Sequence, residues 1–160
     1  MSTELIDALY EKMQQLEKMR GHLAYSQNEV MRWWNPATAF AAWSDRQLES
    51  LVAFKARFAE WQDHLASAMR MIATIENEDT RLFSYVLNYM EQIEILDDMQ
   101  GWQKVRDLRN AATHDYSESD EVKTQHFDSL LQSTPYLFKV FESLQNFVLT
   151  HYAGSGKVTR

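Results

Sequence analysis

Hydrophobic residues recur along most of the chain at intervals of three and four positions, the spacing that places side chains on one face of an α-helix. The clearest stripe advances by 3, 4, 3, 4, 3, 4 and 3 residues: Leu51, Phe54, Phe58, Trp61, Leu65, Ala68, Ile72 and Ile75. A continuous stripe of this length faces a partner helix. We therefore expect its aromatic side chains to lie in a protein core and not to bind a cofactor.

A long first helix is predicted before this stripe. Its apolar positions are Ile6, Leu9, Met13, Leu16 and Leu23. The helix is expected to end at Trp33-Trp34-Asn35-Pro36, because the residue before a proline is disfavoured in the α conformation. The two tryptophans are either ordinary core residues or an exposed anchor for a partner protein.

Three further helices are predicted after an acidic turn at residues 76–79. Thr80 is placed to cap the first of them. Gln100-Gly101 is expected to be a break between helices, and the short helix after it is expected to run from Trp102 to about Tyr116. Pro135 either kinks the last helix or opens a new one at its first position. The apolar stripes of the first and last of these helices are Phe83, Val86, Leu87, Met90 and Ile93, and Phe127, Leu130, Thr134, Leu137, Phe141, Leu144 and Val148.

Long amphipathic helices with short connections predict an all-α fold, an antiparallel bundle of four to five helices. Residues 1–152 are expected to form a single helical domain, and residues 153–160 a frayed tail. The composition agrees with this prediction. Four Gly and two Pro in 160 residues are too few for the turns of an all-β fold, and a hydrophobic content of 45% is enough for a core.

Cysteine content and charge narrow the function classes. The chain has no Cys, which excludes a disulfide framework and a Cys-ligated zinc site. It has no apolar stretch of membrane-spanning length and no apparent signal peptide, so we expect a cytoplasmic protein that does not enter a membrane. The net charge of −7 repels nucleic acid at long range. Any RNA binding therefore requires a local cationic site.

The only concentrated chemical signal is the run from Arg109 to Tyr116. On a helix, Val105, Leu108, Ala111 and Ala112 share the face that packs on the bundle, and Arg106, Asp107, Asn110, Thr113 and His114 lie on the other face. Arg109 lies at the border, about 140° from His114. A straight helix does not direct both side chains at one atom. Either the helix ends near His114, or a second copy of the chain supplies half of the site across a two-fold axis.

An Arg and a His near each other are suited to cleavage of RNA, which carries its own nucleophile, the 2′-hydroxyl. His114 can move a proton near neutral pH, and Arg109 can stabilise the negative charge of the transition state. Asn110 can hold a phosphate oxygen or orient the histidine. The reaction needs no metal and no other cofactor. Spacing alone also permits an ordinary structural reading, in which Arg109 forms a surface ion pair and His114 caps a helix.

The segment around this run resembles the HEPN-domain family, in particular its HepT-like ribonuclease toxins. The family motif is an Arg, usually followed by Asn or another polar residue, then a His four to six positions on and often a Tyr two further. Here Arg109, Asn110, His114 and Tyr116 occupy those places. The likeness extends from about Thr80 to Val148 and is only topological for the first 75 residues.

This resemblance implies a HEPN bundle that forms a homodimer with the active cleft at the two-fold interface. It implies metal-independent cleavage of an RNA substrate, with Arg109 and His114 catalytic and Asn110 assisting. Such toxins are paired with a minimal nucleotidyltransferase antitoxin, and transfer of AMP to the motif tyrosine would modify Tyr116. Two other readings remain. One is a non-catalytic HEPN protein that uses the same cleft to bind a nucleotide or to present itself to a nucleotidyltransferase; the other is a helical adaptor with a vestigial motif.

Cationic residues near the motif are the candidate RNA contacts. Lys104 and Arg106 form the densest group with Arg109, and Arg70 and Arg81 are potential neighbours in the fold. No Glu-x-x-His or His-x3-His pair of the ferritin type is present, so no metal site is expected. Asp63-His64 is expected to be an exposed helical pair. The acidic residues Glu91, Glu94, Asp97 and Asp98 are expected to form a solvated face and not a metal site.

Overall fold

The computed structural model describes residues 3–111 and 119–152. Within these ranges it has five α-helices, one short 3-10 helix and no strand, which confirms the predicted all-α class. The elements are α1 (Thr3–Met31), η1 (Phe40–Ala42), α2 (Asp45–Ile75), α3 (Phe83–Gln92), α4 (Met99–Asn110) and α5 (Asp120–His151). No helix among the described residues is long and apolar enough to cross a membrane.

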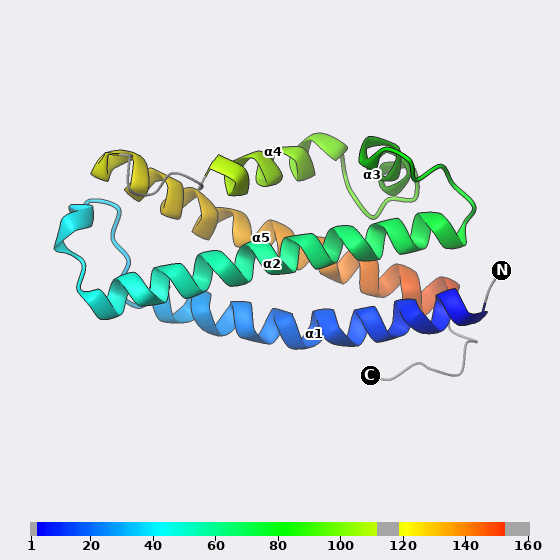
Figure 1. The fold of residues 1–160 in the computed structure, drawn as a ribbon, viewed down its shortest axis with the longest axis horizontal. Coiled ribbons are helices and arrows are strands. Elements are labelled where there is room, and N and C mark those ends of the chain that lie inside the picture. Colours follow the sequence, from blue (N-terminus) through cyan, green and yellow to red (C-terminus); the bar gives the residue numbers. More distant parts are fainter. Residues whose placement is uncertain (1–2, 112–118, 153–160) are drawn as a thin grey trace.

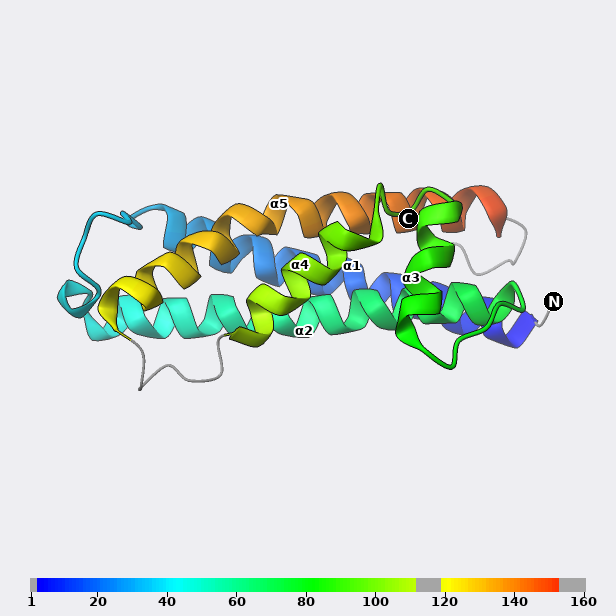
Figure 2. The same cartoon turned by 90° about the horizontal axis from the view of Figure 1, so that it is seen from above.

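Three long helices, α1, α2 and α5, lie side by side and form the body of the molecule (Figure 1). α1 runs opposite to α2 and α5, which run in the same direction, and α4 lies against α5 and also runs opposite to it. The short helix α3 lies across the others, as Figure 2 shows. The bundle is therefore antiparallel only in part, because α2 and α5 run in the same direction and α3 crosses the other helices.

The predicted stripe on α2 forms the centre of the core. All eight of its residues are buried, and Trp61 lies between helices: its indole Nε1 donates to the carbonyl of Leu16 at 3.1 Å. The rings of Phe138 and Phe141 pack against it at centroid distances of 5.3 and 5.6 Å. The helix begins at a capping box, in which Ser44 accepts from the backbone of Gln47 and the Gln47 side chain accepts from the backbone of Ser44.

Tyrosine hydroxyl groups tie the long helices together at one end. The hydroxyl of Tyr10 on α1 donates to the carbonyl of Tyr152, which follows α5, at 2.6 Å. The hydroxyl of Tyr152 donates in turn to Glu76, the C-cap of α2, also at 2.6 Å. Burial raises the pKa of Tyr152, and the Glu76 carboxylate raises it further, so Tyr152 stays a hydrogen-bond donor above the pH at which an exposed tyrosine ionises.

The paired tryptophans take part in packing at the other end of the bundle. Trp33 and Trp34 are half-buried, and the ring of Trp34 stacks on Trp43 with centroids 5.5 Å apart. The Trp34 indole Nε1 donates to Asp128 of α5 at 3.0 Å. This arrangement favours the first of the two predicted roles, because it fastens the connection between α1 and α2 to α5.

Two predicted boundaries are wrong. Thr80 does not cap α3, because the helix begins three residues later, with Leu82 as an N-cap that makes no side-chain hydrogen bond; the Thr80 carbonyl accepts from Arg70 instead. Gly101 does not separate two helices but lies in the first turn of α4. A Cβ at Gly101 would lie 3.1 Å from the hydroxyl of Tyr136, so the glycine permits close packing of α4 on α5.

Of the two alternatives for Pro135, the structure has the proline inside one helix, since α5 continues from Asp120 to His151. Pro135 lacks the N–H that would otherwise bond one turn back. The hydroxyl of the preceding Thr134 donates to the carbonyl of Leu130 at 2.9 Å, so this buried side chain has a partner inside the helix.

Candidate functional site

Acidic residues fix the start of α4, the helix that carries the predicted motif. The Asp98 carboxylate accepts from the backbone N–H of Gly101 at 2.7 Å, and Glu91 of α3 accepts from that of Met99 at 2.8 Å. Both contacts satisfy donors that a helix leaves unpaired in its first turn. These carboxylates, expected to be only a solvated face, therefore set where α4 begins.

The faces of α4 agree largely with the prediction. Val105 is buried and Leu108 half-buried, Arg106 and Asn110 are exposed, and Arg109 lies between the two faces with 28% of its side chain exposed. The prediction fails at the C-terminal end. The helix was expected to continue to about Tyr116 and to bury Ala111, but α4 ends at Asn110 and Ala111 is an exposed C-cap.

Arg109 is held by a carboxylate of the neighbouring long helix. Its Nη1 donates to Oδ1 of Asp63 at 2.5 Å, and its Nη2 donates to Oδ2 at 3.0 Å. A two-point contact of this kind orients the guanidinium plane as well as attracting it. It uses two of the five N–H groups of the arginine, and the other three have no side-chain partner within residues 3–111 and 119–152, which leaves them for a ligand.

A pocket of about 200 Å³ lies beside this ion pair, where α2, α3 and α4 meet. It is lined by Gln62, Asp63, Ala66, Phe83, Trp102, Arg106 and Arg109. Arg106 and Arg109 are three residues apart and therefore adjacent on the helix surface. Two guanidinium groups against one carboxylate leave the lining with a net positive charge, in a chain whose overall charge is negative.

The remaining predicted cations contribute less to this pocket. Lys104 is exposed on α4 and does not line it. The guanidinium carbon of Arg70 lies 5.3 Å from the centre of the Phe83 ring. Phe83 lines the pocket and Arg70 does not, so the Phe83 ring connects Arg70 to the pocket. Arg81 pairs with Asp79, and its guanidinium lowers the pKa of that carboxyl group. The local cationic site thus consists mainly of Arg106 and Arg109.

The other motif residues are not part of this pocket as described. Asn110 is exposed at the last turn of α4 and does not line it. His114, proposed as the proton carrier, and Tyr116, proposed as the AMP acceptor, lie outside the described residues. Of the predicted motif and cationic residues, the structure therefore brings Arg106 and Arg109 together at this pocket.

Two site residues were missed from the sequence, and both lie on α2. Asp63 was predicted to form an exposed pair with His64, but the two have different partners: Asp63 binds Arg109, whereas the His64 ring Nδ1 lies 3.0 Å from Nζ of Lys12. Gln62 is 1% exposed, and neither atom of its amide has a hydrogen-bond partner among the described residues. A signal for Gln62 was present, because it lies four residues after one core phenylalanine and three before Leu65, on the buried face.

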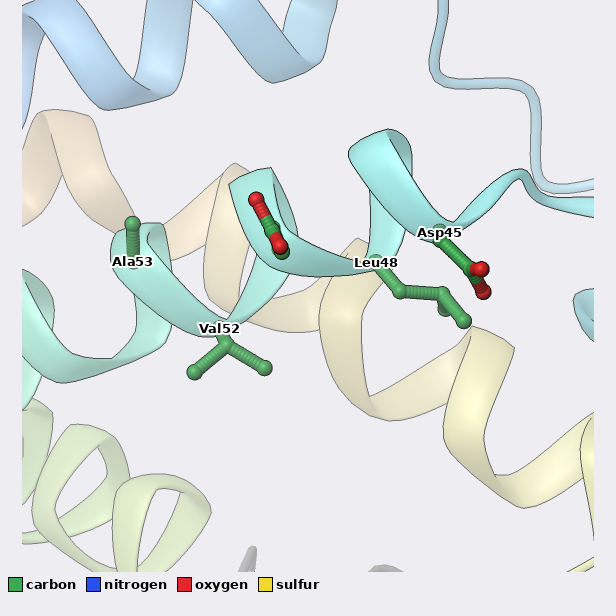
Figure 3. Close-up of a pocket in the computed structure, with 5 residues that line it drawn as sticks. Asp45, Leu48, Val52 and Ala53 are labelled. Carbon is green, nitrogen blue, oxygen red and sulfur yellow. The ribbon is translucent and has the colours of Figure 1, made fainter.

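A second, larger pocket lies at the start of α2 and is less suited to a phosphate. All five residues that line it come from that one helix: Asp45, Leu48, Glu49, Val52 and Ala53 (Figure 3). Val52 is 63% exposed and points away from the helix. The charged members of the lining are carboxylates, which repel an anion.

Comparison of the chain with protein-family models, with curated proteins and with solved structures found no match.

Proposed function

We propose that this protein is a metal-independent endoribonuclease of the HEPN type and the toxin of a toxin–antitoxin pair. The observation that carries the proposal is the position of Arg109: Asp63 orients the first residue of the motif beside Arg106, at the edge of a pocket, and three of its N–H groups have no partner in the part of the chain that the structure describes. Motif resemblance and a cationic pocket in an acidic chain support the same reaction class.

The proposed reaction needs only the RNA and the side chains of the protein. The 2′-hydroxyl oxygen forms a bond to the adjacent phosphorus as His114 takes its proton, and the bond from phosphorus to the 5′-oxygen breaks. The 5′-oxygen leaves with the proton that His114 has taken up, returned directly or through a water molecule, which gives a 2′,3′-cyclic phosphate and a 5′-hydroxyl end and restores the neutral histidine. Arg109 stabilises the extra negative charge on the phosphate oxygens, and Asn110 holds a phosphate oxygen or orients the histidine.

The same proposal includes the predicted assembly. Two copies would meet at a two-fold axis near the exposed face of α4 and join two sets of motif residues in one cleft. The antitoxin would be a minimal nucleotidyltransferase that transfers AMP to Tyr116. An added phosphate there would compete for the guanidinium of Arg109 and block the site.

The test compares the wild type with Arg109→Ala and His114→Ala. Each substitution is expected to lower RNA cleavage by at least about 100-fold and to relieve growth arrest on induced expression. Cleavage is measured with purified protein in a chelator, and the products are examined for 2′,3′-cyclic phosphate ends. Arg32→Ala is the matched control, because Arg32 is an exposed arginine just after α1 whose ion-pair partner among the described residues is Glu29.

Full cleavage by either motif variant, with helix content equal to that of the wild type, would contradict the proposal. Absence of cleavage by the wild type, together with nucleotide binding that Arg109→Ala abolishes, would favour the non-catalytic partner instead.

A further inference from the structure

The amide of Gln62 is the least satisfied polar group in the candidate site. The side chain is 1% exposed, and neither Nε2 nor Oε1 has a partner within residues 3–111 and 119–152. Buried amides in folded proteins are almost always hydrogen-bonded, because burial removes the water that would otherwise pair with them and an unpaired amide costs free energy. An amide that is kept unpaired beside a pocket is therefore available to a ligand that brings its own hydrogen-bonding groups.

The walls of the pocket indicate the shape of such a ligand. Phe83 and Trp102 contribute aromatic side chains to its lining, and the small side chain of Ala66 is also part of it. A dry cavity of about 150 Å³ holds a benzene ring, so the 200 Å³ of this pocket can hold one planar heterocycle. An inorganic phosphate would use the guanidinium groups but not the aromatic walls, and an apolar molecule would leave the amide unpaired.

We propose that this pocket binds one unpaired nucleobase of the RNA and that Gln62 reads its hydrogen-bonding edge. The proposal rests on the proposed function for the identity of the nucleic acid. A glutamine amide presents a donor and an acceptor side by side in one plane, and the edges of the bases present complementary pairs of groups. Proteins that read single-stranded RNA stack unpaired bases on aromatic or arginine side chains and bond their edges in this way.

Arg106 and Arg109 lie where the sugar-phosphate of the bound nucleotide would leave the pocket. Both belong to the lining, and Arg106 is exposed without an ion-pair partner among the described residues. Gln62 and Asp63 are consecutive on α2, so the residue that reads the base and the residue that orients Arg109 belong to the same turn. The base in the pocket would thus place a neighbouring phosphate at Arg109.

The experiment measures the binding of the four ribonucleoside 5′-monophosphates to the full chain by calorimetry. These ligands hold no cleavable phosphodiester, so binding is measured without the reaction. The wild type is expected to bind the best and the worst of the four with affinities at least about tenfold apart, as for a two-point amide–base contact. Gln62→Leu, which keeps the size and removes the amide, is expected to reduce this ratio to about twofold and to raise Tm. Gln15→Leu, the same change at an exposed site of α1, is the control.

Equal binding of the four nucleotides by the wild type, or no binding, would overturn the inference without reference to any variant. An unchanged ratio in Gln62→Leu would overturn it as well. The two proposals fail separately. Base-selective binding without RNA cleavage would retain the pocket and reject the ribonuclease. Cleavage with the same sequence preference in wild type and Gln62→Leu would retain the ribonuclease and reject the base pocket.

Discussion

The helices α2 and α4 both contribute to the candidate site, but they are anchored very differently. α2 buries eleven of its 31 residues, and α4 buries two of its 12, Trp102 and Val105. Hydrogen exchange reports that elements with few buried contacts open at lower free energy than core elements. Asp63, which orients Arg109, and Gln62, which we propose to read a base, thus lie on the rigid element, and the proposed anion contacts Arg106 and Arg109 lie on the element that can adjust.

The Arg109–Asp63 pair compensates for the weak anchoring of α4. It joins residues 46 positions apart and fastens the last turn of α4 to the middle of α2, while Trp102 anchors the first turn. Between these points only Val105 is buried. A functional group on such a helix needs a supporting contact to hold its geometry, and the carboxylate provides it.

Truncation of one large core residue on each helix gives the largest expected effect. Phe58→Ala on α2 and Trp102→Ala on α4 each remove a fully buried aromatic side chain, a change that costs about 3–5 kcal/mol. Phe58→Ala is expected to lower the free energy of global unfolding in urea. Trp102→Ala is expected to lower the hydrogen-exchange protection of α4 first and to leave α2 protected. A uniform loss of protection in Trp102→Ala would show that the two helices unfold as one unit.

Removal of the helix caps is a matched test of smaller size. Ser44→Ala at α2 and Asp98→Ala at α4 each delete a side chain that accepts a backbone N–H, which costs about 1 kcal/mol. For Ser44→Ala we expect a shift of the global unfolding midpoint, and for Asp98→Ala faster exchange confined to the first turn of α4. The contrast between the helices would be refuted by equal shifts of the global midpoint.

Loss of the Arg109–Asp63 ion pair is expected to change the free energy of unfolding less than the core and cap substitutions do, but to lower RNA cleavage clearly. Asp63 is 58% exposed, so Asp63→Asn should lower the free energy of unfolding by at most about 1 kcal/mol. The same change frees Arg109, and a misplaced catalytic group can cost up to about 100-fold in rate. We therefore expect a clear fall in RNA cleavage with a nearly unchanged Tm. Asp97→Asn is the control, because Asp97 forms an exposed pair with Lys139 of α5. Equal cleavage rates in both variants would remove the positioning role of Asp63.

Periodicity predicted the long helices well because many buried positions repeat the same signal. The stripe of α2 is buried throughout, whereas the first helix ends at Met31, five residues before Pro36 and two before the predicted Trp33 boundary. Single-residue signals were less reliable. Thr80 has the chemistry of a cap and Gly101 that of a break, but neighbouring side chains decide otherwise: the carbonyl of Thr80 binds Arg70, and Gly101 makes room for Tyr136.

The sequence by itself determined the helical class, the core stripe of α2 and the face of α4 on which Arg106 lies, because these depend on the local period of the helix. Only the tertiary structure decided that α3 crosses the bundle, that Asp63 holds Arg109, and that the amide of Gln62 is buried unpaired beside a pocket. These features depend on how helices distant in sequence pack, since a stripe shows which face is buried but not which side chains it meets.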